Sequence, residues 1–152
     1  MGSSMDFLDT SFLKTEEIYL SLNHTAQGDP EKDWAPAYYF DICDLSGTKM
    51  GACDLRVGYS ERLYYGGHIG YCVEPPFRGH HYAARACRLL FQLAKKHGMS
   101  YLIITCNPDN LPSRKTCEYL GGELLEIVEL PEDNDMRVES GETHKCIFKF
   151  TL

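Results

Sequence analysis

Residues 73–83 read VEPPFRGHHYA and decide the fold, because a strand ends and a helix begins within them. The preceding residues 64–73 are rich in aromatic and β-branched side chains, which favours a strand. Pro75-Pro76 cannot donate backbone hydrogen bonds to a neighbouring strand, so the strand ends before them. Apolar residues then recur at the helical period over residues 82–97, and Gly98 ends the pattern. The helix start therefore offers free backbone N–H groups, which attract anions.

The charges of the chain are unevenly distributed around this segment. Five Lys and Arg residues and no acidic residue lie between residues 78 and 97, whereas the whole chain has 15 basic and 22 acidic residues. A basic island at a helix N-terminus is a place where a phosphate-bearing ligand binds. An ordinary solvated helix face explains the charges alone equally well.

Composition limits the class of protein. A chain of 152 residues with 43% hydrophobic and 24% charged residues can bury the core of one domain, which we expect over residues 1–152. Residues 1–5 are left out of the fold because Met5 reads as the natural start. We expect no membrane partner, since the sequence has no long apolar run and no visible signal peptide. The net charge of −7 argues against nucleic acid as the principal partner.

The seven cysteines are odd in number, scattered and without a Cys-x-x-Cys pair. This pattern is typical of reduced thiols in a cytoplasmic protein. It does not match the ligand spacing of a zinc site, so we expect no metal.

The rest of the chain alternates strand patterns with turn signals. This predicts an α/β (α+β) fold with a mixed, mostly antiparallel sheet of about seven strands and helices packed on it. The strands are expected over residues 17–22, 37–43, 49–57, 64–73, 100–105, 123–130 and 144–150, the first four as an antiparallel meander. The run 100–105 is continuously apolar, as in a buried parallel strand. A second helix is expected from Asn110 to Gly121-Gly122. Residues 23–36, 60–62 and 131–141 read as loops or turns.

Two motifs carry a family resemblance. Residues 78–83 resemble the Arg/Gln-x-x-Gly-x-Gly/Ala pyrophosphate loop of the GNAT superfamily of N-acetyltransferases. Residues 105–122 are similar to its next motif, a strand, then Asn-x-x-Ser/Ala at a helix start, then a Leu-Gly pair at the helix end. The motif has Ser113 and lacks a tyrosine one turn later. In these two features it resembles the motif of the ribosomal-protein N-terminal acetyltransferases more than that of the aminoglycoside branch. The resemblance implies a splayed pair of central parallel strands and acetyl-CoA as cofactor.

One position departs from the loop pattern, because the central glycine of the family is His81 here. A side chain at this position hinders close approach of the backbone to a diphosphate. An imidazole can instead form charge-assisted hydrogen bonds to it. We interpret the loop as a variant that still binds its ligand.

The resemblance assigns the cofactor to the loop and to the strand before it. The pantetheine arm is expected to bond to free backbone groups of the fourth strand, where Gly66-Gly67 and Gly70 suggest a bulge. Glycines that make room for aromatic neighbours are the alternative. The expected cofactor-binding residues are Tyr71, Cys72, Val73, Arg78, Gly79, His80, His81, Tyr82, Ala83, Asn107, Asn110 and Ser113.

Three residues are candidates for proton transfer. Ser113 is the first candidate for the acid that protonates the departing thiolate, followed by a water and then by Cys117. The alternatives are a helix-start role for Ser113 and a core thiol for Cys117. His68 is a candidate general base facing the acceptor, although an isolated strand histidine is more often structural. Backbone N–H groups near Cys72-Val73 are expected to polarise the carbonyl.

These expectations combine into a function. The resemblance implies direct transfer of acetyl to a primary amine, of a small molecule or of a protein N-terminus or side chain, in a ternary complex of a monomer or homodimer. The acidic segment 131–142 would favour a cationic acceptor, but a solvated loop explains it too. A non-catalytic acyl-CoA-binding or sensing domain is the alternative. A nucleotide-binding protein of another fold is a weaker rival, since the sequence has no Gly-x-x-x-x-Gly-Lys-Ser/Thr loop.

Overall fold

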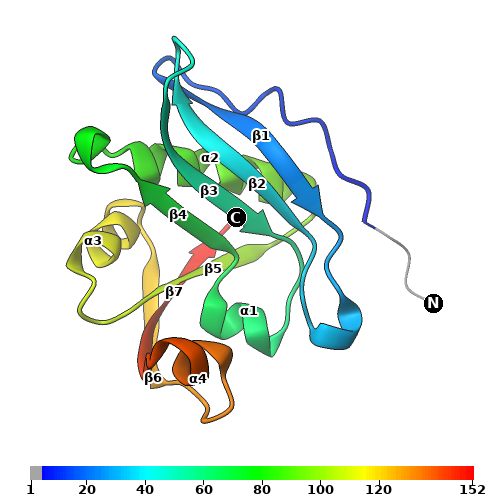
Figure 1. Cartoon of the computed structure of the whole chain (residues 1–152), viewed down its shortest axis with the longest axis vertical. Coiled ribbons are helices and arrows are strands. Elements are labelled where there is room, and N and C mark those ends of the chain that lie inside the picture. Colours follow the sequence, from blue (N-terminus) through cyan, green and yellow to red (C-terminus); the bar gives the residue numbers. More distant parts are fainter. Residues whose placement is uncertain (1–4) are drawn as a thin grey trace.

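The computed structural model describes residues 5–152, which form two sheets and the helices around them (Figure 1). Of residues 1–5, which the sequence analysis leaves out of the fold, residues 1–4 lie outside the described residues. The elements, in chain order, are β1 (Ile18–Ala26), η1 (Pro30–Lys32), β2 (Ala37–Asp44), β3 (Lys49–Arg56), α1 (Glu61–Gly66), β4 (Ile69–Val73), η2 (Pro75–Phe77), α2 (Tyr82–Lys96), β5 (Tyr101–Cys106), α3 (Leu111–Tyr119), β6 (Glu123–Glu129), α4 (Asp135–Ser140) and β7 (His144–Thr151). The strand count of seven over residues 5–152 confirms the prediction.

The sheet divides between β4 and β5. One sheet has the order β1-β2-β3-β4 and the other β5-β7-β6, and every pairing within them is antiparallel. The predicted meander of the first four strands is therefore confirmed. β4 and β5 are connected through α2 and lie at the facing edges of the two sheets, which gives the splayed central pair that the fold requires.

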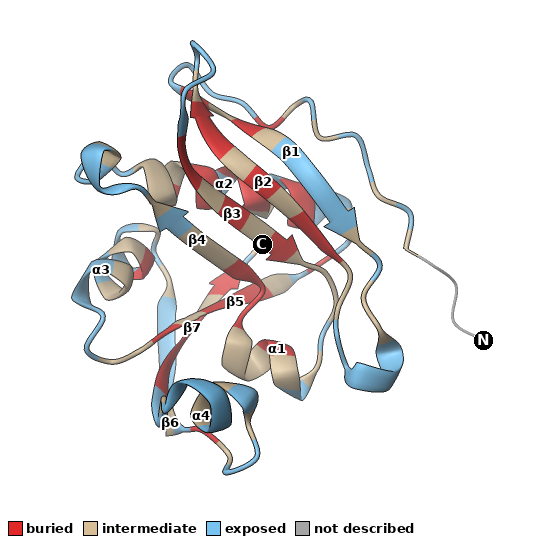
Figure 2. Cartoon of the chain, viewed as in Figure 1, coloured by how far each residue is buried: buried red, intermediate tan, exposed pale blue. Residues whose placement is uncertain are grey.

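One hydrophobic core joins both sheets. Its largest buried side chains come from β1 to β3, from α2 and from β5 and β7. Within α2 the buried residues are Ala84, Ala86, Cys87, Leu89, Leu90, Leu93 and Ala94, which form the predicted apolar face. α2 lies behind the first sheet in the view of Figure 1, and β2 alternates between buried and partly exposed residues (Figure 2). The front face of that sheet is not covered by any helix of residues 5–152 (Figure 1).

A helix replaces the turn and the first half of the strand expected over residues 60–73. Ser60 caps α1 by accepting a hydrogen bond from the Leu63 N–H at 3.2 Å. Gly67 ends the helix with φ +82°, so the strand starts only at Ile69. The prediction was wrong because the aromatic residues 64–65 favour a strand locally, whereas the serine cap and the glycine stop favour a helix.

Two loop predictions were also wrong. β1 continues to Ala26 through an irregular register between Leu22 and His24, so residues 23–26 belong to a strand. Within the acidic segment 131–141, Asn134 caps α4 by accepting from the Met136 N–H, and Gly141 ends it. Both segments are rich in polar side chains, which are typical of loops. Here the polar side chains belong to a strand end and a helix that lie at the surface of the molecule.

Candidate active site

A cleft of about 510 Å³ lies where the two sheets separate. The end of β4, the loop before α2 and the start of α3 enclose it. The lining residues are Tyr71, Cys72, Val73, Phe77, Arg78, Gly79, His81, Tyr82, Ala83, Asn110, Pro112, Ser113, Lys115 and Thr116. The structure thus brings ten of the twelve expected cofactor-binding residues into one cleft.

The start of α2 forms the anion-attracting end of this cleft. Among residues 5–152, no side chain caps α2, and its first turn contains no acidic residue. No carboxylate of this turn therefore competes for its N–H groups, and the nearby Glu17 carboxylate is bonded to the Arg85 guanidinium. Arg78 Nε donates a hydrogen bond to the Val73 carbonyl at 2.8 Å, which ties the loop to the end of β4. The cleft can hold a phosphate at this end.

His81 adopts a backbone conformation that glycine adopts more readily than other residues. Its φ of +61° and ψ of +24° lie in the left-handed region. The imidazole stacks on the Tyr119 ring of α3, with centroids 4.2 Å apart and planes at 13°. The Arg88 guanidinium lies 5.2 Å from the same tyrosine ring. His81 therefore links the loop to α3.

Two hydroxyl groups meet across the cleft. Tyr71 of β4 donates a hydrogen bond to Ser113 Oγ of α3 at 3.2 Å. Burial raises the pKa of the Tyr71 hydroxyl, which keeps it protonated at neutral pH. Asn110 Oδ1 accepts from the Ser113 N–H at 3.3 Å, so the predicted helix cap is present and orients the serine. Sequence reasoning named Tyr71 only for cofactor binding; its pairing with Ser113 joins elements that are 42 residues apart.

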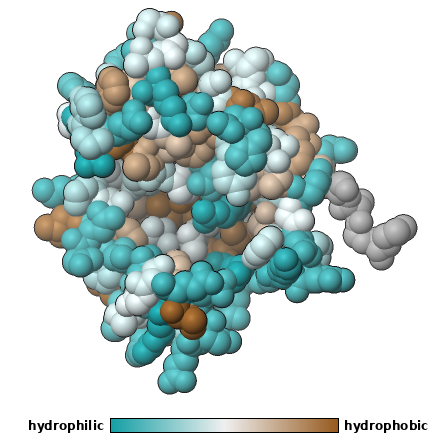
Figure 3. Space-filling model, viewed as in Figure 1, coloured by the Kyte–Doolittle hydropathy of each residue, from teal (hydrophilic) through white to brown (hydrophobic). Residues whose placement is uncertain are grey.

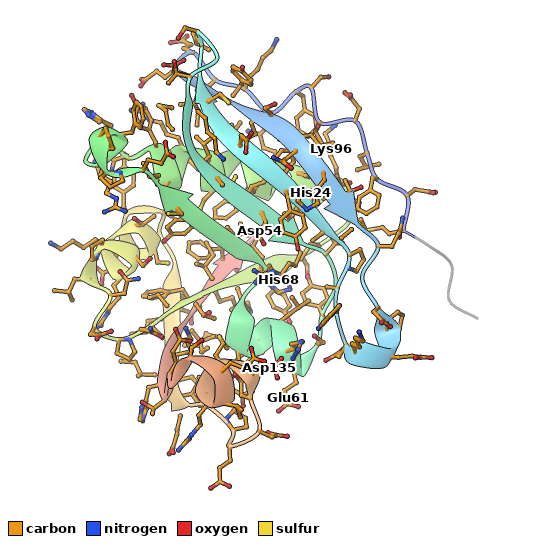
Figure 4. The ribbon with its side chains drawn as sticks, viewed as in Figure 1. His24, Asp54, Glu61, His68, Lys96 and Asp135 are labelled. Carbon is orange, nitrogen blue, oxygen red and sulfur yellow. The ribbon has the colours of Figure 1, made fainter. Side chains whose placement is uncertain are left out.

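His68 lies outside this cleft, which corrects its assignment as a base facing the acceptor. The residue is 1% exposed, and both ring nitrogens are engaged: Nε2 donates to the Gly58 carbonyl at 2.8 Å and Nδ1 accepts from the Ile103 N–H at 2.9 Å. The backbone N–H of His68 donates to the Ile103 carbonyl at 2.7 Å. Burial lowers the pKa of the imidazole. His68 joins the start of β4 to β5, as its position in Figure 4 shows.

Cys117 is the second correction. Its side chain is 0% exposed and packs in the core, and burial raises the pKa of the thiol to about 12. An acid must reach the sulfur that it protonates, and a thiol enclosed by the core does not. The alternative stated from the sequence, a core thiol on a helix face, describes its position.

Two expected cofactor ligands also lie elsewhere. Asn107 lines a separate cavity of about 550 Å³ beside β6 and β7, and its Nδ2 donates to Glu142 Oε1 at 3.1 Å. His80 is exposed and does not line the cleft. Adjacent loop residues point in different directions, so a motif match alone does not place every side chain in a site.

The comparison with protein families decides the relationship. Residues 10–123 match the family model described as the acetyltransferase (GNAT) domain. The chain belongs to the GNAT acetyltransferase family. This confirms the resemblance carried by residues 78–83 and 105–122, and no curated protein matches the sequence.

Solved GNAT structures share the fold. An acetyltransferase of the GNAT family from Bacillus anthracis has a TM-score of 0.58 at 18% identity, over 74% of this chain and 65% of that one. The microcin C7 self-immunity acetyltransferase MccE, solved with acetyl-CoA and AMP, has a TM-score of 0.60 at 19% identity, over 76% and 61%. The Salmonella typhimurium acetyltransferase that modifies the N-terminal serine of ribosomal protein L7/L12 has a TM-score of 0.58 at 16% identity, over 76% and 64%. This chain thus spans less than two thirds of the length of each of these three structures.

Three further observations concern the described chain. None of the helices in residues 5–152 is long and apolar enough to cross a bilayer. In the same residues no three His, Cys, Asp or Glu side chains gather as metal ligands do. All seven cysteines lie in this part and are free thiols, with Cys72 exposed and the other six buried.

Proposed function

We propose that this GNAT protein is an acetyl-CoA-dependent N-acetyltransferase that acts on a primary amine in a ternary complex. The single observation that carries the proposal is the cleft, which brings an uncapped helix start and the Tyr71–Ser113 hydroxyl pair together in one space. Acetyl-CoA has a diphosphate and a thioester at separate positions along one molecule, and it supplies the acetyl group as that thioester.

The residues of the loop fit the diphosphate. The backbone N–H groups of residues 79–83 and the Arg78 guanidinium provide hydrogen bonds and positive charge. Lys115 adds a second cation from α3. Within residues 5–152, β4 pairs with β3 alone, so the backbone groups along its other edge are available to the pantetheine amides.

The hydroxyl pair fits the departing sulfur. Tyr71 donates its proton to Ser113 Oγ, which leaves the serine proton free to be donated into the cleft. When the amine nitrogen bonds to the acetyl carbon and the carbon–sulfur bond breaks, Ser113 gives its proton to the sulfur and Tyr71 replaces it. The proton that the nitrogen loses as the amide forms then restores the Tyr71 hydroxyl through water, so that a neutral amide and a free thiol result. Because the Tyr71–Ser113 hydroxyl pair connects β4 with α3, the proton donor lies where the two sheets separate.

Isothermal calorimetry and free-thiol release test these roles separately. Arg78→Ala should weaken acetyl-CoA binding about tenfold, whereas Lys95→Ala, a charge removed from the other end of α2, should leave it unchanged. Ser113→Ala should lower turnover with a responsive amine on the order of 10²-fold and change the affinity for acetyl-CoA little. Absence of heat with acetyl-CoA, or the reverse pattern in the variants, rejects the proposal.

A non-catalytic acyl-CoA-binding domain is the second candidate. The observation that favours it is that His68 and Cys117, two of the three expected proton-transfer residues, lie away from the cleft. The discriminating experiment follows free thiol during incubation with acetyl-CoA and a panel of amines. Thermal stabilisation by acetyl-CoA without thiol release from any amine selects the binding domain.

A further inference from the structure

A second cavity of about 410 Å³ lies on the face of the first sheet that is turned away from α2. Strand register places His24, Tyr39, Asp54 and Gly70 side by side, one on each of β1 to β4. The His24 and Tyr39 rings stack, with centroids 4.4 Å apart and planes at 11°. Figure 4 shows His24 and Asp54 on this open face.

The floor of the cavity consists of small residues. The next cross-strand row on the same face contains Asp41, Ala52 and Cys72, by the pairings Asp41↔Ala52 and Ala52↔Cys72. Ala52, Gly70 and Cys72 are small residues, so the surface of the sheet is hollow beside β4. The larger rings of His24 and Tyr39 project from the sheet at the side of this hollow. Figure 3 shows a mixture of hydrophilic and hydrophobic residues on this face. The cavity can therefore hold a ligand with a charged end and an apolar body.

Asp54 belongs to β3, and its carboxylate lies beside Gly70 of β4. A Cβ atom at Gly70 would come within 2.6 Å of Asp54 Oδ1, so the absence of a side chain at position 70 makes room for the carboxylate. Arg56 Nε lies 3.1 Å from Oδ2, and Arg56 Nη1 donates to the Gly66 and Gly67 carbonyls at 3.3 and 3.0 Å. Oδ2 is buried and has no hydrogen bond of good geometry from any atom of residues 5–152, the arginine included.

The second cavity meets the cofactor cleft at β4. Tyr71 and Cys72 line both, with Tyr71 bonded to Ser113 on the cleft side and Cys72 exposed. The two spaces therefore lie on opposite sides of the one strand where the sheets separate. A thioester held beside Tyr71 and a molecule held over Gly70 and Cys72 are neighbours.

We infer that this second cavity receives the acceptor and that Asp54 binds its ammonium group and accepts the proton that the attacking nitrogen must lose. The inference rests on the proposed acetyl transfer and names its acceptor class: primary amines with a flat apolar or aromatic body, which packs on Tyr39. The ammonium gives one proton to the Asp54 carboxylate, and its nitrogen then bonds to the acetyl carbon as the carbon–sulfur bond breaks and the sulfur takes a proton from Ser113. The nitrogen loses its second proton as the amide forms, which balances the proton given to the sulfur.

The burial of Asp54 favours it for this role over the other carboxylate of the cavity. Burial raises the pKa of Asp54, and the Arg56 guanidinium partly opposes that effect. Both carboxylates face a cation, Asp41 with Lys49 at 3.4 Å and Asp54 with Arg56 at 3.1 Å, so they differ in burial and not in pairing: Asp54 is the more buried and its Oδ2 has no hydrogen bond from residues 5–152. The other titratable groups that line the cavity are His24, Tyr39, Lys49, Cys53, Tyr71 and Cys72. A carboxylate with a raised pKa is a better proton acceptor than an exposed one.

Cys72 provides a test that needs no turnover. Its labelling by an aromatic disulfide reagent is followed without acetyl-CoA, so that no coenzyme A thiol forms to consume the reagent, and the other six cysteines are buried. We expect 2-phenylethylamine to slow the labelling of the wild-type protein and 2-phenylethanol, its neutral analogue, to have no effect. Asp54→Asn should reduce the apparent affinity for the amine about tenfold or more, whereas Asp41→Asn should retain most of it.

Gly70→Ala and calorimetry make the result decisive. The alanine displaces the Asp54 carboxylate without removing it and should also reduce protection. Asp54→Asn should keep wild-type affinity for acetyl-CoA, and Gly70→Ala should keep a cooperative urea transition, which shows that both variants are folded. Equal protection in wild-type and Asp54→Asn proteins, or none in the wild type, overturns the inference and leaves acetyl-CoA binding intact. Loss of acetyl-CoA binding in the wild type would instead reject the proposed function itself.

Discussion

At His81, the left-handed backbone of the loop favours glycine, whereas the stack on Tyr119 requires the imidazole side chain. A left-handed backbone costs a non-glycine residue about 1–2 kcal/mol, and the stack on Tyr119 returns about 0.5–1.5 kcal/mol. We therefore expect His81→Gly to change the free energy of unfolding by less than about 1 kcal/mol, as measured by urea denaturation. It should bind acetyl-CoA at least as tightly as the wild type, because the backbone can then approach the diphosphate. Weaker binding in calorimetry would show that the imidazole itself contacts the phosphates.

His68 predicts how stability depends on pH. Its pKa in the folded protein lies below its usual 6.5, so the unfolded chain binds the proton more readily. The stabilisation is complete above about pH 6.5 and is lost as the pH falls toward the lower folded value. His97, whose pKa burial also lowers, adds to the same trend. His68→Gln should give a shallower loss of unfolding free energy between pH 7 and pH 5.5 than the wild type, and an equal slope would contradict this account.

At the scale of elements, the junction of α1, β4 and β5 depends on Gly67. A Cβ atom there would lie 3.2 Å from both the Ile103 carbonyl and the Thr105 N–H nitrogen, and φ is +82°. Gly67→Ala should therefore lower the free energy of unfolding by at least about 1 kcal/mol. Gly66→Ala is the matched control, because a Cβ at Gly66 meets no atom within 4 Å and φ is not positive. Urea denaturation that gives equal values for both variants would remove the steric argument.

The same junction shows what the sequence could predict and what it could not. The apolar period of residues 82–97 and the Asn110 cap are local signals, and α2 and α3 lie where they indicate. The role of His68 depends on Gly58 and Ile103, 10 and 35 residues away, and no local pattern contains these contacts. Asp54 is similar: its place beside Gly70 follows from register, which becomes known only when the strands are paired.

Over the whole molecule, the division into two sheets predicts where a ligand acts. Among residues 5–152, β4 and β5 are joined by His68 at one end of β4, and the cleft lies at its other end. Acetyl-CoA bound there would contact β4, the start of α2 and the start of α3 together, and would restrict the separation of the sheets. Hydrogen exchange measured by mass spectrometry should slow at residues 71–84 and 110–116 when acetyl-CoA is added.

The antiparallel pair β1–β2 is the internal control for that measurement. It lies away from the cleft and forms its ladder without the ligand, so its exchange should change little under native conditions where local opening dominates. Uniform slowing across both sheets would mean that the ligand acts through global stability alone. Slowing confined to β6 and β7, beside the separate 550 Å³ cavity, would place the ligand on the wrong side of β5 and contradict the proposed cleft.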